Sequence, residues 1–120
     1  AATAPVLVVA IAKTTSSKNA GKENKAAIYD LGQAIAFLTF QAAADGLHVH
    51  QMGGFDSNAL GNALHVPEGY QVQTVSAIGY IGDPEQLHPN LKAMEFNERE
   101  RQPLRDMVFG KSFGETADFI

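Results

Sequence analysis

The amino-acid sequence predicts an α+β fold in which an antiparallel sheet packs against one long central helix over residues 24–45. Two observations carry this prediction: an apolar run at 28–47 has helical spacing, and the runs at 5–12 and 71–80 have the composition of strands. With 120 residues, 45% of them hydrophobic, we expect 1–120 to form a single domain. A chain of this size is small for enclosing a large cofactor, so we expect it to assemble.

The helix expected over 24–45 is apolar on nearly all sides. Leu31 and Leu38 recur at helical spacing on one side, while Phe37 and Phe40 lie on the other, so we expect burial nearly all round. Its alanines allow a second helix to approach closely, which favours a homodimer formed through this helix. We do not expect a membrane span, because four polar residues interrupt the run: Asp30, Gln33, Gln41 and Asp45.

The two strand candidates differ in their patterns. Residues 5–12 are β-branched and apolar on both faces, which is typical of a strand in the middle of a sheet. Residues 71–80 alternate between polar and apolar side chains and then become apolar. A short extended segment at 47–52 precedes a helix expected over 56–64, for which Asp56 is a suitable N-cap.

The remaining segments are polar or interrupted by proline. Residues 13–25 hold four lysines, and a solvated loop is the favoured interpretation over an anion site. Residues 82–98 are acidic and contain prolines, so we expect a loop. A short helix is expected over 101–109, with Pro103 in its first turn.

Composition and charge narrow the classes of partner. The formal net charge is −4 and the acidic excess lies in 61–120, which argues against nucleic acid. The chain has no cysteine, hence no disulfide and no thiolate ligand. No basic segment precedes the apolar run at 5–12, so we expect no leader and a cytoplasmic location. Because a buried-type strand begins within a few residues of Ala1, we also expect a further segment upstream.

Two residue pairs are candidates for ligand binding. Gly53 and Gly54 stand between an extended segment and a helix, where they form either a tight turn or an exposed backbone that a planar ligand can approach. Arg99 and Arg101 form either an alternating-charge surface strip or a pair that binds a phosphate. The residues alone leave both alternatives open.

Other side chains give weaker signals. His48 and His50 share one face of an extended segment, but nothing nearby supplies convincing further ligands, so we expect ordinary half-buried histidines and no metal site. The sequence contains no serine in a G-x-S-x-G elbow and no phosphate-binding glycine loop followed by Lys-Ser or Lys-Thr. No side chain is therefore assigned a catalytic role.

Six segments occur in a recognisable order, at 4–9, 29–34, 41–47, 50–56, 76–80 and 99–104. Together they strongly resemble the FMN-dependent nitroreductase family, and the resemblance covers essentially the whole chain. The family's N-terminal half has no counterpart here, so the chain resembles the C-terminal half of that fold.

This resemblance implies a homodimer with FMN at its interface, which passes hydride from NAD(P)H through the flavin to nitroaromatic, quinone or similar small-molecule acceptors. It implies that the glycine backbone lies near N5 and O4 of the flavin and that the arginines bind its phosphate. Six residues are implied to bind the cofactor: Gln51, Met52, Gly53, Gly54, Arg99 and Arg101.

The resemblance also leaves a second possibility. Gly53 stands where some members of the family carry an acidic residue, and only about half of the expected flavin contacts are present. The alternative is a non-catalytic fragment or a flavin-less dimerisation module that keeps the core of the fold.

Overall fold

The computed structural model describes residues 3–19 and 21–120, in two units, Ala1–Gly82 and Asp83–Ile120. Ala1, Ala2 and Ala20, which the sequence analysis placed at the start of the chain and in the polar loop, lie outside the described residues.

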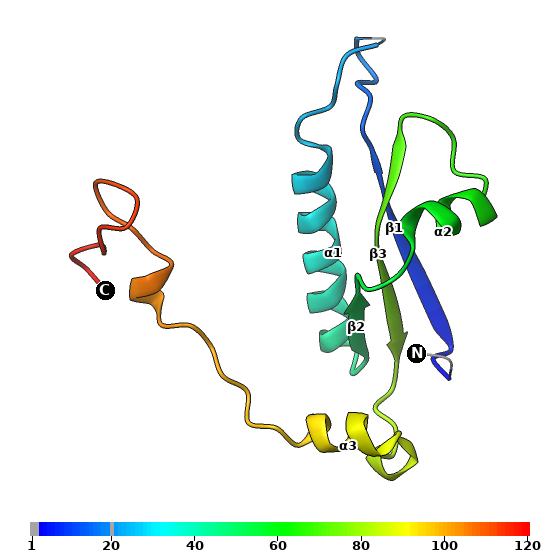
Figure 1. Cartoon of the computed structure of the whole chain (residues 1–120), viewed down its shortest axis with the longest axis vertical. Helices are drawn as coiled ribbons and strands as arrows, with labels where there is room; N and C mark the ends of the chain where they lie inside the picture. The colour runs from blue at the N-terminus through cyan, green and yellow to red at the C-terminus, as the bar shows by residue number, and fades with distance from the viewer. Residues whose placement is uncertain (1–2, 20) are drawn as a thin grey trace. The chain divides into compact units, whose positions relative to one another are not determined.

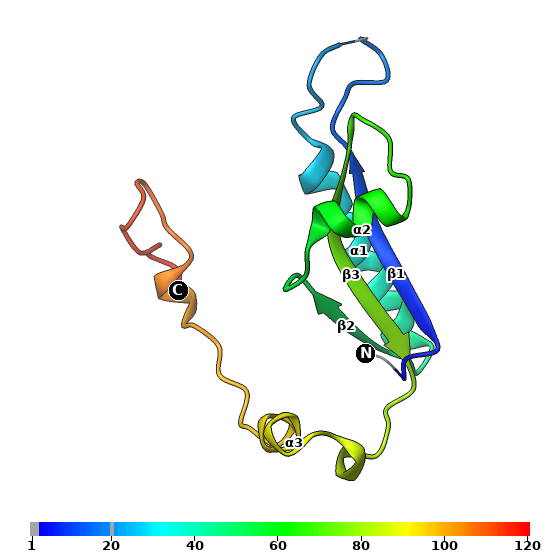
Figure 2. The same cartoon turned by 45° about the vertical axis from the view of Figure 1, so that its right-hand side comes forward.

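The first unit contains a three-stranded antiparallel sheet (Figure 2). Its strands are β1 (Val6–Lys13), β2 (His48–Met52) and β3 (Tyr70–Gly79), in the order β1-β3-β2. The strands predicted at 5–12 and 71–80 are confirmed, and the extended segment at 47–52 supplies the third.

One prediction about this sheet is wrong. The apolar run at 5–12 indicated a strand in the middle, yet β1 lies at an edge and β3 is central. Leu7 is 55% exposed in the single chain. The run on β1 therefore reflects its long pairing with β3 and its contact with a helix, because a strand's own composition does not specify which neighbours pair with it.

The longest helix of the described residues is α1 (Ala27–Ala44), which contacts β1 and β2 and runs alongside the sheet (Figure 1). It begins three residues later than predicted because Asn24 belongs to the preceding loop. The Asn24 backbone N–H donates to the Thr14 carbonyl at 2.7 Å, and its side-chain amide donates to the Lys13 carbonyl at 3.2 Å.

The predicted glycine cap at the end of α1 is confirmed. Gly46 has a φ of +75°, a left-handed conformation that glycine adopts without steric cost. The Gly46 N–H donates to Ala43 at 3.1 Å and the Leu47 N–H donates to Ala42 at 2.8 Å. These two bonds form a Schellman motif, which satisfies the last carbonyls and turns the chain into β2.

The core between α1 and the sheet is built from small side chains. Gln51 and Val8 are both paired with Ser76 across the strands, so these three residues share one face of the sheet. The Gln51 side chain is hydrogen-bonded to Thr39 of α1, which identifies this face as the one that α1 covers. The small residues buried on α1 and on β1 are alanines: Ala10, Ala12, Ala27 and Ala42.

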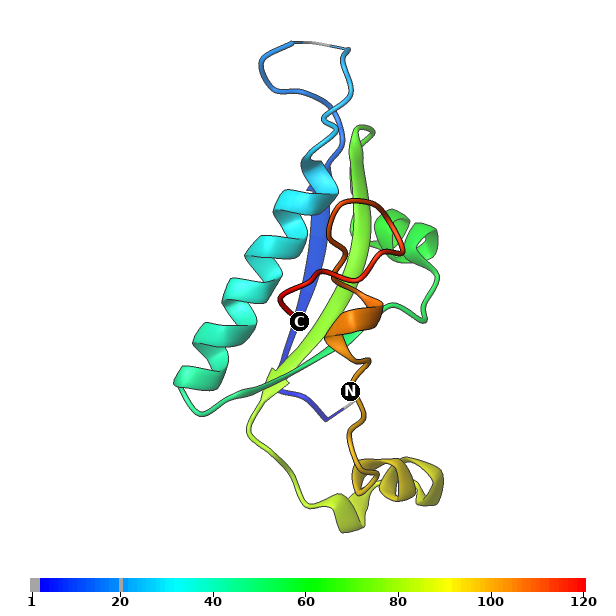
Figure 3. The same ribbon diagram turned by 90° about the vertical axis from the view of Figure 1, so that its left-hand side faces the viewer.

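The second helix, α2 (Ser57–Ala63), packs against β3 on the other face of the sheet, as Figure 3 shows. A register shift between Ala10 and Ile11 pairs Ile11 with Val72, so Val72 points away from α1. The α-carbon of Gly61 lies close to it: a Cβ added there would be 3.7 Å from Val72 Cγ2. Glycine at 61 thus brings α2 near the strand.

Only one side of α1 is buried in the single chain. Leu31 and Leu38 are half-buried against the sheet, as their spacing predicted. On the outer side, Tyr29, Phe37 and Phe40 are 72%, 68% and 74% exposed, so the expected all-round burial is not present in one chain. No helix in the described ranges is long and apolar enough to cross a membrane, and the location in the cell stays a prediction.

The second unit differs from the prediction at two places. It contains η1 (Pro84–Gln86), α3 (Pro89–Glu95) and η2 (Leu104–Asp106). The predicted loop at 82–98 therefore contains a helix, because Pro89 stands at the first helical position, where a missing N–H costs nothing.

The helix predicted over 101–109 is wrong beyond a single turn. Only η2 forms, since Phe109 is bridged to Thr116 and the chain reverses direction. The Thr116 hydroxyl also donates to the Arg105 carbonyl at 3.2 Å. These contacts hold the backbone in a turn. They use backbone groups, such as the Arg105 carbonyl, that a continuing helix would need for its own hydrogen bonds.

The cap of α2 generates a stability prediction. The Asp56 carboxylate accepts hydrogen bonds from the N–H groups of Asn58 and Ala59 at 3.0 and 2.9 Å, as the sequence predicted. We expect Asp56→Ala to lower the free energy of unfolding by about 1 kcal/mol, because two N–H groups lose their acceptor. Asp56→Asn keeps an acceptor oxygen and should remain near wild type in a urea titration; equal losses for both variants would contradict the cap.

Candidate functional site

The candidate site in the first unit lies where β2 leaves the sheet. Gln51 and Met52 are the last two residues of the strand, and Gly53 and Gly54 follow before Asp56 caps α2. The pairing of Met52 with Val75 ends the ladder, so the two glycines continue beyond the edge of the paired segment. Sheet and helix together hold both ends of this short connection.

The glycine pair has no structural need to be glycine. Neither Gly53 nor Gly54 has a positive φ, so the backbone does not require the conformational freedom of glycine. A Cβ added at either position would meet no heavy atom within 4 Å, so packing within the described residues does not require glycine either. What the two glycines provide is an exposed strip of main chain with open space in front of it.

The backbone donors of this strip are also free. Neither the Gly53 nor the Gly54 N–H forms a backbone hydrogen bond within the part of the chain that the structure describes. Two amide donors without side chains in front of them can approach the edge of a flat ligand that carries acceptor atoms. The tight-turn interpretation is not supported, because the backbone at 53–54 forms no turn.

The two residues before the glycines point in opposite directions. The Gln51 side chain reaches α1, where its Nε2 donates to Thr39 Oγ1 at 3.4 Å. Met52 alternates to the other face of the sheet and is half-buried. Gln51 therefore contributes to a ligand beyond this strand end through its backbone, while its side chain is bound to α1.

The two histidines of β2 lie on the face shared with Met52. His48 and His50 are exposed and are paired with Gly79 and Ala77 of β3. Among the residues that the structure describes, no group of three or more histidine, aspartate or glutamate side chains is placed to hold a metal ion. The prediction that these histidines are half-buried is wrong, because β2 is an edge strand and both residues are exposed.

The arginine candidates lie in the second unit. Arg99 and Arg101 belong to an irregular segment between α3 and η2, and both are exposed. Arg101 Nη1 donates to the Glu100 carbonyl at 3.0 Å, and within the described ranges neither guanidinium is paired with a carboxylate. Several donors on each side chain therefore remain for an anion such as a phosphate. The glycine pair belongs to the other unit, and joint action of the two pairs stays a prediction.

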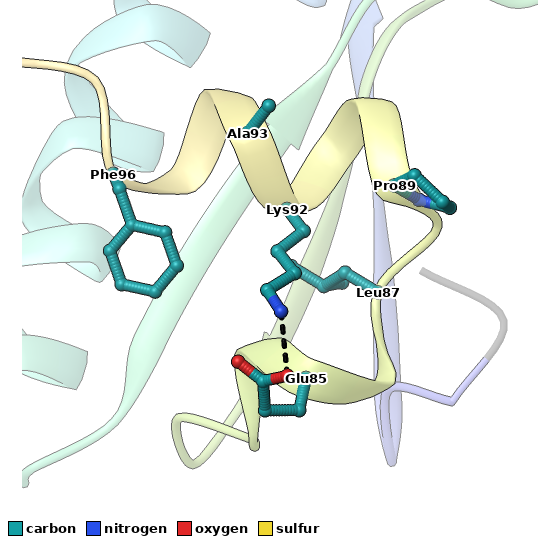
Figure 4. A pocket seen from close by; sticks show the side chains of 6 residues that line it. All are labelled: Glu85, Leu87, Pro89, Lys92, Ala93 and Phe96. Atoms are coloured by element: carbon teal, nitrogen blue, oxygen red, sulfur yellow. Dashed lines mark hydrogen bonds and ion pairs between the residues drawn. The ribbon is translucent and has the colours of Figure 1, made fainter.

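A feature that the sequence analysis did not find is an open groove of about 500 Å³ in the second unit (Figure 4). Across it Lys92 forms an ion pair with Glu85 at 2.6 Å. The segment at 82–98 carried only a loop signal, and no motif marks the groove. Its lining offers apolar contact and one satisfied ion pair: Glu85, Leu87, Pro89, Lys92, Ala93 and Phe96.

Comparison with known proteins identifies relatives of the chain. Residues 1–80 match the nitroreductase family. An uncharacterised 15.4 kDa protein of Mycolicibacterium smegmatis is 34% identical over 97 residues, which cover 78% of this chain and 65% of that protein. Among solved structures, an oxidoreductase containing FMN is 30% identical, with a TM-score of 0.83 over 94% of this chain and 58% of that one.

More distant structures share the fold. A nitroreductase family protein from Clostridium novyi NT is 18% identical, with a TM-score of 0.56, and covers 94% of this chain and 54% of its own. An FMN-dependent nitroreductase from Clostridium difficile R20291 is 24% identical, with a TM-score of 0.54, over 72% of this chain and 58% of that one.

The extent of these matches bears on the site. The chain spans less than two thirds of the length of the relatives that it matches. The family match at 1–80 includes Gln51, Met52 and both glycines but ends before Arg99 and Arg101. The strand-end site therefore lies inside the segment that the family match covers.

The open space at the glycine pair generates the next prediction. Gly54→Ala should leave the melting temperature unchanged or slightly raised, because the new methyl group meets nothing and the unfolded chain loses entropy. Gly69→Ala is the contrasting variant: its φ of +82° and the Thr15 hydroxyl 2.8 Å from the added Cβ should cost about 1–3 kcal/mol. Thermal unfolding followed by circular dichroism measures both. A large loss for Gly54→Ala would show that the fold itself needs this glycine.

Proposed function

The chain belongs to the nitroreductase family, and we propose that it is an FMN-dependent oxidoreductase of nitroreductase type that takes hydride from NAD(P)H and reduces nitroaromatic, quinone or similar small acceptors. The observation that carries this proposal is the open main chain of Gly53 and Gly54 within the segment that matches the family. The 30% identical structure of an oxidoreductase containing FMN supports the choice of cofactor.

The residues at the end of β2 fit a flavin. A flat heteroaromatic ring needs an unobstructed backbone and N–H donors at its edge, and Gly53 and Gly54 offer both. When bound, FMN supplies the redox chemistry by accepting hydride and passing reducing equivalents on, so this chain needs no side-chain acid or base for that step. The protein's task is to place the ring and to shape the electrostatics around it.

We propose that the arginines bind the phosphate of the cofactor. A phosphate monoester carries nearly two negative charges at neutral pH, and guanidinium groups bind such an anion through paired N–H donors. Arg99 and Arg101 are two residues apart in an irregular segment, so both can serve one anion if that segment is extended. Their exposure and their lack of a carboxylate partner among the described residues support this role.

A titration with FMN tests the proposal against its alternative. The alternative is a flavin-less dimerisation module or non-catalytic fragment, and it is favoured by the fact that the chain covers only 58% of the FMN-containing structure. If the chain binds FMN, purified protein should take up one FMN per chain and show the absorbance band of the bound flavin at about 450 nm. Protein that stays colourless and leaves added FMN fully fluorescent would favour the module.

We also propose that the chain acts as a homodimer formed through the outer side of α1. Tyr29, Phe37 and Phe40 expose large aromatic surfaces there, and Ala36 and Ala43 lie beside them with little bulk. Exposed apolar surface of this extent on one helix is typical of an interface. A second copy presents the same small and large residues, which suits a two-fold symmetric contact.

The phosphate role predicts the effect of single arginine substitutions. Arg101→Ala should weaken FMN binding by roughly 1.5–3 kcal/mol, the scale of a hydrogen bond to a charged group. Arg105→Ala is the matched control, because Arg105 lies in η2 and uses its backbone carbonyl, which alanine keeps, to accept from Thr116. Quenching of flavin fluorescence gives the three affinities. Equal values for wild type and both variants would remove Arg101 from the site.

The dimer proposal predicts the effect of a charge on the outer side of α1. Ala42 is buried against the sheet, so Ala43, which is exposed, is the residue to change. Ala43→Glu should convert a sedimenting dimer to a monomer without loss of helix content, since an unpaired charge enters the contact. Ala63→Glu is the matched control, because Ala63 is an exposed alanine of α2, on the other face of the sheet, and this variant should stay dimeric. A wild-type chain that is monomeric at micromolar concentration would contradict the interface.

A further inference from the structure

The α1-covered face of the sheet contains a small polar group beside the candidate site. Thr39 of α1, Gln51 of β2 and Ser76 of β3 share the face of the sheet that α1 covers; Thr39 is half-buried, Gln51 is exposed and Ser76 is fully buried. The almost fully buried residues of α1 and β1 are alanines, and a buried polar group such as Ser76 is costly unless it is paired. Gln51 stands two residues before Gly53, so the hydrogen bond that holds its side chain also bears on the position of the glycine pair.

The hydrogen bonds of Thr39 define the orientation of the Gln51 amide. The Thr39 hydroxyl donates to the Ile35 carbonyl at 2.8 Å, which uses its single hydrogen. Toward Gln51 this hydroxyl is therefore only an acceptor, and it receives the Gln51 Nε2 at 3.4 Å. The amide nitrogen is turned to the helix, and Gln51 Oε1 is left as an acceptor on the other side of the amide.

Ser76 provides a complementary group next to Gln51. The two residues are directly paired across β2 and β3 and share one face, which places their Cβ atoms about 5 Å apart. Ser76 is 0% exposed, and its hydroxyl has no hydrogen-bond partner among the described residues. The unpaired Ser76 hydroxyl therefore lies on the same face as the Gln51 amide.

We propose that Thr39 is a positioning residue for the flavin-binding backbone, acting through Gln51. By holding the Gln51 amide against α1, Thr39 anchors the end of β2. The main chain of Met52, Gly53 and Gly54 is thereby presented in one arrangement. This inference rests on the proposed function for its ligand, whereas the anchoring itself is a property of the chain alone. An anchored backbone pays less ordering entropy when a ligand binds, so its loss lowers affinity.

Three variants test the proposal. Thr39→Val removes the hydroxyl and keeps the shape, whereas Thr39→Ser keeps the hydroxyl. Thr74→Val is the matched control, because Thr74 is a half-buried threonine of β3 that is not the partner of the Gln51 amide. We expect Thr39→Val to raise the FMN dissociation constant roughly three- to ten-fold, as for the loss of one neutral hydrogen bond, and to shift the bound-flavin absorbance spectrum. Thr39→Ser and Thr74→Val should match wild type in both.

A second measurement needs no cofactor. In the ¹⁵N-labelled FMN-free protein, the Gln51 side-chain amide resonance, identified by its loss in Gln51→Leu, should move in Thr39→Val and stay in Thr39→Ser. Should Thr39→Val fail to fold, Thr39→Ala replaces it, and in a Gln51→Leu background the Thr39 substitution should add no further loss of affinity.

The outcomes separate this inference from the proposed function. A wild-type chain that binds no FMN would refute the proposed function, and with it the flavin-positioning role, while the amide resonance would still report whether the anchor exists. Wild-type binding with unchanged affinity and spectrum in Thr39→Val, or equal losses in Thr39→Ser and Thr39→Val, would overturn the positioning role alone.

Discussion

The contact between α1 and the sheet depends on alanine. Ala10 and Ala12 on β1 and Ala27 and Ala42 on α1 are almost fully buried, and they let helix and strands approach closely. Each methyl group removes little apolar surface from water, so each contributes only about 0.8 kcal/mol by burial. A core of this kind defines the spacing of the layers well but contributes modestly to stability. The larger apolar side chains on this side of the helix, such as Leu31 and Leu38, are only half-buried.

That division explains the character of the outer surface. Phe37 and Phe40 lie on the opposite side of the same helix, where one chain leaves them exposed. Because these side chains are exposed in a single chain, they add nothing to its stability through burial. The surface that they form is instead suited to contact with another molecule. The same helix thus has two roles. Its side with small residues supports the sheet, and its side with large aromatic residues is the proposed subunit contact.

The candidate site arises where this framework stops. β2 is paired along its length with β3, and α2 is capped by Asp56, so the few residues between them are held at both ends. Within that connection, Gly53 and Gly54 leave the main chain uncovered. Thr39 links the site to α1 through Gln51, so the helix that organises the core also reaches the strand end. Rigid supports around a short open backbone are the arrangement that ligand binding favours.

Local sequence signals predicted the elements whose causes are local. The helical spacing of Leu31 and Leu38, the glycine at 46 and the cap at Asp56 each act within a few residues of the chain, and each was predicted correctly. The short helix α3 was missed because prolines suggested a loop, although Pro89 is at the one helical position where proline is favourable. The end of helix at η2 depended on the bridge between Phe109 and Thr116, which no local pattern reveals.

For the site, the sequence by itself determined which residues are candidates: two adjacent glycines after an extended segment and two arginines before a proline. It left open whether the glycines serve a turn or a ligand. Only the tertiary structure decided that neither φ nor packing requires glycine at 53 and 54, that β1 lies at an edge, and that the Gln51 amide is bound by Thr39. These facts depend on which segments, distant along the chain, come to lie together. Such contacts are made by the whole fold, whereas composition and spacing report only on the residues nearby.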